Sequence, residues 1–199
     1  MANQLPDDAV LIEQAKTGSI DAFNQLVLRY QDLVYTVSYR IMGESESASD
    51  ITQDTFLKAY QRLDTFRGGN FKAWLTRIAS NLCYDELRKV KRHPETYLDD
   101  LAPEESDDGA PIPSDADTPE EIAQQTELQQ VIQDCILALS DDQRVILVMC
   151  DVQGLSYQEI ADETQVQIGT VKSRLSRARL AVRNCLQGFS ELLPDEYRL

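Results

Sequence analysis

The sequence has little of what metal or redox chemistry requires. Its 199 residues include one histidine and four cysteines, with no C-x-x-C pair. This pattern predicts neither a zinc site nor a redox pair, so we expect no metal and reduced, buried thiols. The cysteines are Cys83, Cys135, Cys150 and Cys185. A phosphate-binding glycine loop and a G-x-S-x-G nucleophile motif are also absent, which predicts no enzyme, no catalytic residue and no cofactor.

Long apolar runs are absent too. The longest, Val145 to Cys150, is far too short to span a bilayer, so we expect no membrane insertion. Residues 1–8 show neither a basic n-region nor an apolar h-region, and we therefore expect a cytoplasmic protein without a secretory signal. With 42% hydrophobic and 27% charged residues, the composition is that of one ordinary globular domain or two small ones.

The charge balance first argues against a nucleic-acid partner, because the formal net charge is -15. The acidic residues are concentrated in the middle, however. Residues 94–134 contain 13 acidic residues and no Lys or Arg, whereas residues 29–93 contain 11 basic and 8 acidic ones. From Ile168 to Cys185 there are five basic residues and no acidic one. Such local excesses of positive charge are able to bind phosphate.

The acidic middle also divides the chain. Residues 94–119 combine repelling carboxylates with several prolines and a glycine, which predicts a flexible linker. We therefore expect an N-terminal domain over residues 8–93, a C-terminal domain over 120–188 and a tail over 189–199.

Apolar residues recur at three-and-four spacing in both domains, and strand patterns are essentially absent. The sequence thus predicts an all-α fold of two small helical domains joined by the acidic linker. In the second domain, Ser140 and Ser156 are each the first residue of a Ser-x-x-Gln/Glu pattern, which predicts two capping boxes.

A helix-turn-helix is predicted near the C-terminus. A short helix from Ser156 to Glu163 and a longer one from about Gly169 to Leu186 have the spacing of this motif, in which the second helix enters the major groove. The alternative is a basic, solvated helix face with no DNA contact. The candidate base or phosphate contacts are Thr170, Lys172, Ser173, Arg174, Arg177 and Arg179.

These residues carry a family resemblance. The segments GLSYQEIA (154–161) and GTVKSRLSRAR (169–179) resemble region 4 of bacterial sigma-70 family sigma factors of the extracytoplasmic-function (ECF, sigma-E-like) type, which reads the minus-thirty-five promoter element. The departure is at the turn, where the family usually has Leu-Gly and this chain has Thr164-Gln165. A left-handed Gln165 would cost roughly 1 kcal/mol relative to glycine.

The N-terminal domain resembles the same family. The segment DITQDTFLKAY (50–60) is similar to sigma region 2.2, which grips the clamp helices of core RNA polymerase. The resemblance implies that Asp50, Gln53 and Asp54 contact that partner; their spacing alone gives one edge of a helix. Without the resemblance, a solvated acidic face is the simpler interpretation.

Residues 66–89 resemble regions 2.3 and 2.4, which open the minus-ten element and hold its non-template strand. Such melting requires a pocket for an unstacked base, with aromatic surface and cations around it. Trp74 fits core packing as well as stacking on DNA. The implied minus-ten contacts are Asn70, Lys72, Trp74, Arg77, Asn81, Arg88 and Lys89.

The resemblance implies a sigma factor that binds core polymerase through the beta-prime clamp helices and the beta flap, reads two promoter elements and melts DNA. An anti-sigma factor is a further expected partner. The alternative is a stand-alone regulator with a LuxR-type helix-turn-helix, which would leave residues 50–81 unexplained.

Overall fold

The computed structural model describes residues 7–92 and 119–192, with the side chains of the second range from Thr126 onward. The contacts of the chain divide it into two compact units, one ending at Glu86 and one beginning at Leu87. Every regular element in the described ranges is helical, which confirms the predicted fold class. Of the predicted linker, only Pro119 lies inside the described residues.

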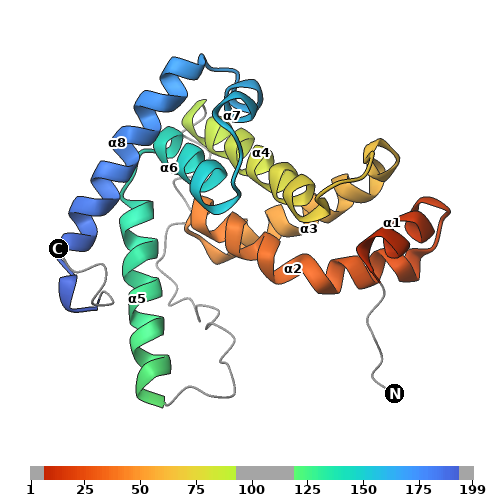
Figure 1. Ribbon diagram of the computed structural model, residues 1–199, viewed down its shortest axis with the longest axis horizontal. Coiled ribbons are helices and arrows are strands. Elements are labelled where there is room, and N and C mark those ends of the chain that lie inside the picture. Colours follow the sequence, from red (N-terminus) through yellow and green to blue (C-terminus); the bar gives the residue numbers. More distant parts are fainter. Residues whose placement is uncertain (1–6, 93–118, 193–199) are drawn as a thin grey trace. The chain divides into compact units, whose positions relative to one another are not determined.

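The first unit is a helical bundle (Figure 1). Its helix α2 begins after Ser19, whose side chain accepts a hydrogen bond from the Ala22 N–H at 3.3 Å, and ends at Gly43 in a left-handed conformation with φ 79°. This is the usual division of labour between an N-cap serine and a glycine past the helix end. The elements are α1 (Asp8–Lys16), α2 (Ile20–Met42), α3 (Ser45–Gln61), the 3-10 turn η1 (Leu63–Thr65) and α4 (Phe71–Arg92), whose last six residues lie beyond the boundary at Glu86.

The core of the first unit is formed by one stripe from each helix. In α1 and α2, these stripes include Leu11, Leu26 and Val34, which are almost fully buried. Helix α2 packs against α1 and α3. From α4, Leu75 and Ala79 have no exposed surface, as the three-and-four periodicity predicts.

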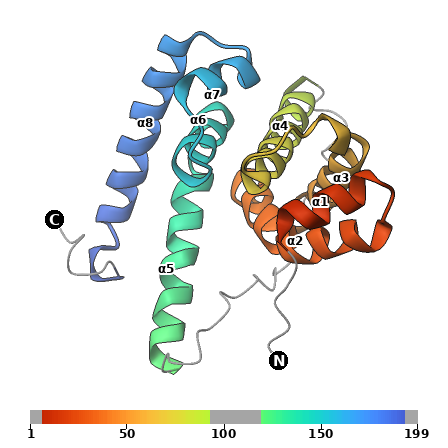
Figure 2. The ribbon, with the colours of Figure 1, turned by 45° about the vertical axis from the view of Figure 1, so that its right-hand side comes forward.

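The second unit is built around its last long helix (Figure 2). Helix α8 packs against α5, α6 and α7, and Val171, Leu175 and Ala178 provide its buried stripe. The elements are α5 (Pro119–Leu137), α6 (Asp141–Leu147), the π turn η3 (Val148–Val152), α7 (Tyr157–Thr164), α8 (Ile168–Gln187) and the 3-10 turn η4 (Ser190–Leu192). No helix within the described ranges combines the length and apolar character of a membrane span.

One of the two predicted capping boxes is present. Ser156 accepts from the Glu159 N–H at 3.3 Å, and Glu159 Oε2 accepts from the Ser156 N–H at 2.9 Å. The prediction for Ser140 was wrong, since its side chain makes no capping bond at the start of α6. There the Gln143 N–H donates instead to the Ser140 carbonyl at 2.9 Å.

The expectation of four reduced thiols was also wrong. Cys135 of α5 and Cys185 of α8 form a disulfide with their Cα atoms 5.8 Å apart. The two cysteines are separated by 50 residues in sequence and meet only because α5 packs against α8. Cys83 and Cys150 are free thiols, the first buried and the second half-buried.

Candidate nucleic-acid interface

The helix-turn-helix consists of α7 and α8. Helix α7 ends at Thr164. The next residue, Gln165, adopts the left-handed conformation, with φ 56° and ψ 38°, at the position where the family usually has glycine. The Gln165 amide compensates in part by donating to the Asp162 carbonyl at 2.5 Å. Ala161, 6% exposed, provides the small side chain that close packing of α7 on α8 needs. The turn therefore forms without the usual Leu-Gly pair.

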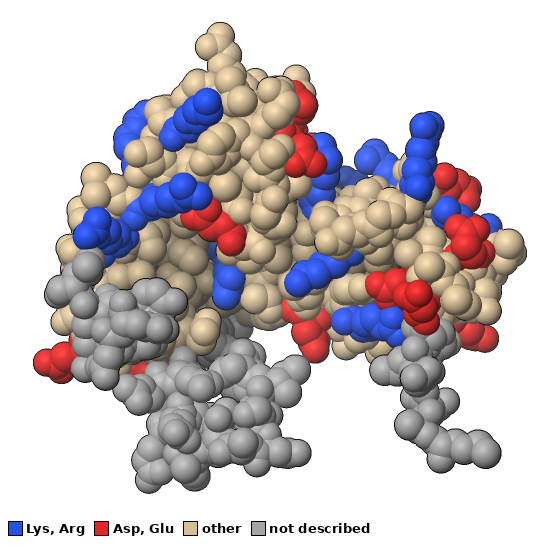
Figure 3. All heavy atoms as spheres, viewed as in Figure 1, with Lys and Arg blue, Asp and Glu red and all other residues tan. Residues whose placement is uncertain are grey.

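Helix α8 has one apolar and one basic face. Opposite its buried stripe, Lys172, Ser173 and Arg177 are exposed, while Thr170 and Arg174 are half-buried. No acidic residue lies between Ile168 and Gln187, and basic side chains gather along α8 on the face drawn in Figure 3. A helix with this charge on its outer face attracts phosphate and carries donors for base edges.

Two arginines of α8 form ion pairs within the second unit. Arg174 Nη2 lies 2.9 Å from Asp142 Oδ2 of α6, and Arg179 makes a two-bond pair with Asp151 of η3. The Arg179 guanidinium lowers the pKa of the Asp151 carboxyl, mainly through these hydrogen bonds. Arg179 also donates to Cys150 Sγ at 3.8 Å. Sequence reasoning missed both pairs, because each joins residues about thirty positions apart along the chain.

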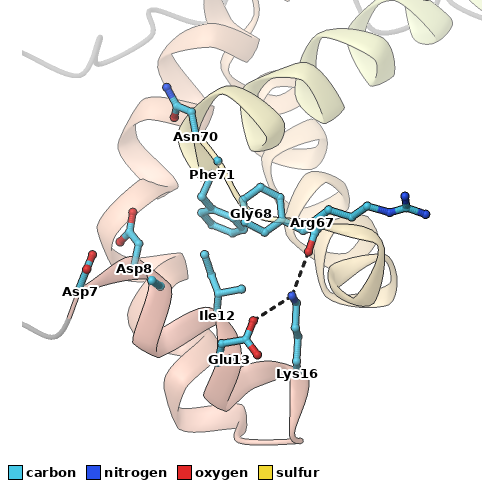
Figure 4. A pocket seen from close by; sticks show the side chains of 12 residues that line it. Asp7, Asp8, Ile12, Glu13, Lys16, Arg67, Gly68, Asn70 and Phe71 are labelled. Carbon is cyan, nitrogen blue, oxygen red and sulfur yellow. Dashed lines mark hydrogen bonds and ion pairs between the residues drawn. The ribbon is translucent and has the colours of Figure 1, made fainter.

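The loop Phe66–Asn70 borders a pocket of about 540 Å³ (Figure 4). Gly68 and Gly69 have φ of +93° and +96°, a backbone conformation that a residue with a Cβ adopts only under strain. Asn70 closes the loop as the cap of α4, because its Oδ1 accepts from the Ala73 N–H at 3.1 Å. Helix α1 forms the other side of this pocket, which the sequence did not indicate.

Trp74 belongs to an aromatic cluster at the base of this loop. Its ring centroid lies 5.3 Å from that of Phe66 and 5.6 Å from that of Phe71, and Tyr30 of α2 packs edge-on against Phe71. Phe66 and Phe71 are buried, whereas Trp74 is half-buried. The structure thus gives Trp74 a packing role and leaves part of its ring accessible.

The other candidates on α4 differ in exposure. Lys72 is exposed in the first turn, and Arg77 and Asn81 are half-buried further along. Arg88 and Lys89 are exposed near the end of the helix, where positive charge complements the helix dipole. These five residues follow α4 from the loop to its C-terminal turns.

A second surface lies on α3. Asp50, Gln53 and Asp54 are all exposed, as their spacing predicts. Gln53 also lines an apolar groove of about 520 Å³ between α2 and α3. The exposed side chains of Ile20 and Leu57, 63% and 60% accessible, form part of this groove. The sequence indicated the polar edge but not the groove, since its apolar residues fit the ordinary helix periodicity.

The described part of the chain holds no cluster of metal-ligating side chains. Residues 7–92 and 119–192 bring together no group of three or more His, Cys, Asp or Glu side chains that could hold an ion.

Comparison with known proteins identifies the family. Residues 26–93 match the model of sigma-70 region 2, and residues 129–182 match that of sigma-70 region 4. The ECF RNA polymerase sigma factor SigW of Bacillus subtilis is 38% identical over 181 residues, covering 88% of this chain and 95% of SigW. The chain belongs to the ECF sigma factors.

Other relatives of this sigma factor agree. The ECF RNA polymerase sigma-E factor of Escherichia coli K12 is 37% identical over 189 residues, which cover 94% of this chain and 97% of that protein. Among solved structures, the sigma factor RpoE of Bartonella quintana, in complex with the anti-sigma factor NepR, superposes with a TM-score of 0.59 at 30% identity and covers 84% of this chain and 98% of that one.

Membership of the family gives the function. A sigma factor binds core RNA polymerase and directs promoter-specific initiation of transcription, reading the minus-ten and minus-thirty-five elements, and this chain carries both conserved sigma-70 regions. The LuxR-type alternative is not favoured, because it accounts for only one of the two matched regions.

Proposed function

We propose a division of labour between the two units of this sigma factor: the first docks on core polymerase and captures the opened minus-ten strand, and the second reads the minus-thirty-five element. The observation that carries the proposal is α8, an acid-free helix with a buried apolar stripe and an exposed basic face in a chain of net charge -15. Such a face in an acidic protein is best explained by contact with a polyanion.

The minus-thirty-five contacts are assigned to the first half of α8. Thr170, Lys172 and Ser173 are close enough to the start of the helix to meet base edges, and Arg177 follows one turn later for phosphate. Arg174 enters this group already oriented by Asp142, 2.9 Å away. Arg179 is assigned a supporting role, because DNA would have to compete with its two bonds to Asp151.

The minus-ten contacts are assigned to the loop 66–70 and the adjoining face of α4. The pocket beside the loop is large enough for a nucleobase, and Trp74, which packs on Phe66 and Phe71 of the pocket lining, keeps part of its aromatic ring accessible. Asn70 is the last residue of the loop and Lys72 lies in the first turn of α4. Arg77 and Asn81 follow along α4, and Arg88 with Lys89 supply positive charge for duplex phosphates. None of these groups needs to perform chemistry, so we propose that the protein is not an enzyme.

Core polymerase is assigned to α3 and the groove beside it. The acidic edge of Asp50, Gln53 and Asp54 borders apolar side chains, a combination that suits a helical partner with basic and apolar residues. We propose that the beta-prime clamp helices dock there and that the second unit contacts the beta flap.

An anti-sigma factor is proposed as a further partner. The similar Bartonella protein was solved in complex with the anti-sigma factor NepR. The exposed apolar residues of the α2–α3 groove would need cover when core polymerase is absent. We propose that the sigma factor works in the cytoplasm, where polymerase and promoter DNA are found.

The decisive experiment is run-off transcription from a genomic promoter pool with bacterial core polymerase, with and without the sigma factor. Discrete new transcripts that share two upstream elements are expected. Two double variants then separate the surfaces: Arg174→Glu with Arg177→Glu should abolish minus-thirty-five-dependent initiation at unchanged core affinity, and Asp50→Lys with Asp54→Lys should weaken core binding first.

Matched controls are available on the same helices. Arg183→Glu changes an arginine of α8 that is exposed like Arg177 and lies six residues beyond it, and Glu46→Lys changes an exposed carboxylate in the first turn of α3. Both should initiate normally. Loss of core binding in the α8 double variant, or unchanged core affinity in the α3 double variant, would contradict the assignment. Duplex binding by the sigma factor alone, with no transcript and no co-elution with polymerase, would favour a stand-alone regulator.

A further inference from the structure

Helix α1 lies outside the part of the chain that matches sigma-70 region 2, which begins at Leu26. It nevertheless belongs to the first unit, because Leu11, Ile12 and Ala15 are buried and the helix packs on α2. Helix α1 and the loop 66–70 face each other across the 540 Å³ pocket (Figure 4). One side of this pocket therefore comes from the matched region and the other from α1, which lies outside it.

The two sides of the pocket are joined by one side chain. Lys16 Nζ donates to the carbonyl oxygen of Phe66 at 2.9 Å and to Glu13 Oε1 at 3.0 Å. The Lys16 side chain is only 22% exposed, whereas that of Glu13 is 73% exposed. The bond to Phe66 is therefore the sheltered one, and it connects residues 50 positions apart. Hydrogen bonds from an ammonium group to a partly buried carbonyl are stronger than neutral ones.

The opposite end of α1 is fixed as well. Asp8 accepts hydrogen bonds from Arg29 and from the Tyr30 hydroxyl, both on α2. Burial and the bond to Asp8 raise the pKa of Tyr30 to about 12, so its hydroxyl stays protonated and continues to donate. Because α1 is held at both ends, the ammonium group of Lys16 has a defined position relative to the loop.

The loop needs such an anchor. Gly68 and Gly69 have left-handed φ angles and no side chains, and the space where a Cβ would lie is empty around both. The loop is fixed only near its ends, at Asn70 by the cap of α4 and at Phe66 by its ring and its carbonyl. Glycine loses more conformational entropy than any other residue when it is ordered, and here two occur in succession.

We propose that Lys16 is a positioning residue for promoter opening: by holding the Phe66 carbonyl it keeps the loop 66–70 in the shape that receives an unstacked minus-ten base. This inference rests on the proposed function of the loop and adds α1, a helix outside the matched region, to the minus-ten machinery. Lys16 itself does not contact DNA in this role.

The test uses the full chain with four substitutions. Lys16→Met and Lys16→Gln remove the ammonium group, and Lys16→Arg keeps a cationic donor. Glu13→Gln removes the negative charge of the exposed partner of Lys16 and leaves the bond from Lys16 to Phe66. The first readout is hydrogen exchange of the Phe66 and Ala73 amides, which are hydrogen-bonded at the two ends of the loop. The second is quenching of Trp74, the single tryptophan, which packs on Phe66. Neither readout depends on polymerase or DNA.

In Lys16→Met and Lys16→Gln, exchange of the Phe66 and Ala73 amides should rise about tenfold and Trp74 should be quenched more readily, as expected for loss of one charge-assisted hydrogen bond. Initiation from a duplex promoter with core polymerase should fall by a similar factor at unchanged core affinity. Glu13→Gln should match the wild type, and Lys16→Arg should recover most of the loop protection.

Unchanged exchange in both Lys16→Met and Lys16→Gln, with a cooperative unfolding transition, would overturn the anchor. Faster exchange with normal initiation would overturn the positioning role. If the wild-type protein starts no transcripts while Lys16→Met still loosens the loop, the proposed function fails and the anchor stands.

Discussion

Arg179 of α8 holds Asp151 of η3 through two hydrogen bonds, from Nε to Oδ2 at 3.0 Å and from Nη2 to Oδ1 at 2.5 Å. The pair ties α8 to the turn that precedes the helix-turn-helix. A residue that the sequence marks as a DNA contact therefore has a structural partner of its own.

This pair makes the stability of the second unit depend on acid. In the folded protein the pKa of the Asp151 carboxyl lies below its ordinary 3.8, mainly because Arg179 donates hydrogen bonds to it. The ionised carboxylate therefore stabilises the fold at a pH above its unfolded pKa. This contribution is lost as the pH falls through the folded pKa. Asp151→Asn should lower the free energy of unfolding at neutral pH by less than about 1 kcal/mol, since the pair is partly exposed. Urea unfolding at a series of pH values measures this difference, which should vanish in strong acid. The exposed Asp162 on α7 gives a control as Asp162→Asn; a pH-independent difference for Asp151→Asn would contradict the argument.

The two serines at the starts of α6 and α7 form a natural pair for comparison. Ser156→Ala removes a capping box and should cost about 1 kcal/mol of unfolding free energy. Ser140→Ala, at a helix start whose serine side chain makes no capping bond, should cost clearly less. Chemical denaturation measures the free energy of unfolding of both variants. Equal losses would show that the side-chain capping bonds do not determine the cost of these substitutions.

The left-handed Gln165 marks a place where the protein can be stabilised. Gln165→Gly removes a strain of roughly 1 kcal/mol. The gain should be somewhat smaller, because the bond from the Gln165 amide to the Asp162 carbonyl is lost.

Gly154, with φ 76° just before α7, provides the opposite case. Gly154→Ala should destabilise the second unit although no atom lies near the added Cβ, since only the backbone conformation opposes it. The thermal midpoints of both variants test the pair of predictions, and a shift in the same direction for both would refute the conformational explanation.

The disulfide between α5 and α8 should contribute strongly to stability. Closing a loop of 50 residues is worth about 4 kcal/mol in the chain-entropy relation. Dithiothreitol, or Cys135→Ser with Cys185→Ser, should lower the thermal midpoint of the second unit and leave that of the first unchanged. Thiol titration of the unfolded protein without reductant should detect only Cys83 and Cys150. Detection of all four cysteines would contradict the pairing.

The two free thiols should differ in reactivity. Burial raises the pKa of Cys83 to about 12, so it remains protonated at neutral and mildly alkaline pH and is also inaccessible. Burial and the neighbouring Asp151 also raise the pKa of Cys150, which is only half-buried. Because the thiolate is the reactive form, iodoacetamide should label Cys150 slowly and Cys83 only after unfolding. Mass spectrometry of the alkylated protein identifies the site, and equal labelling of both in the folded state would refute the burial of Cys83.

The fold was predictable where the information is local. The stripes of α2, α4 and α8 follow from periodicity, and the family resemblance marked Gln165 as the residue at the turn where a glycine is usual. The failure at Ser140 shows the limit of a local pattern, because Ser-x-x-Gln permits a capping bond without enforcing it, and here the backbone carbonyl takes the donor.

The candidate site was predictable only in part, for a different reason. The exposed residues of α3 and α8 could be assigned from one helix at a time. The bonds from Arg179 to Asp151, from Lys16 to Phe66 and between Cys135 and Cys185 join residues 28 to 50 positions apart. Only the packing of several helices determines such contacts, and a single sequence contains no periodic signal for them.

The disulfide has a topological consequence. Together with the backbone between its two cysteines it makes a closed covalent ring, and α6, η3 and α7 lie wholly inside that ring with nearly all of α8. A protease that cuts one peptide bond within the ring opens it without releasing a fragment. The whole helix-turn-helix can thus be nicked once and still remain a single molecule as long as the bond is oxidised.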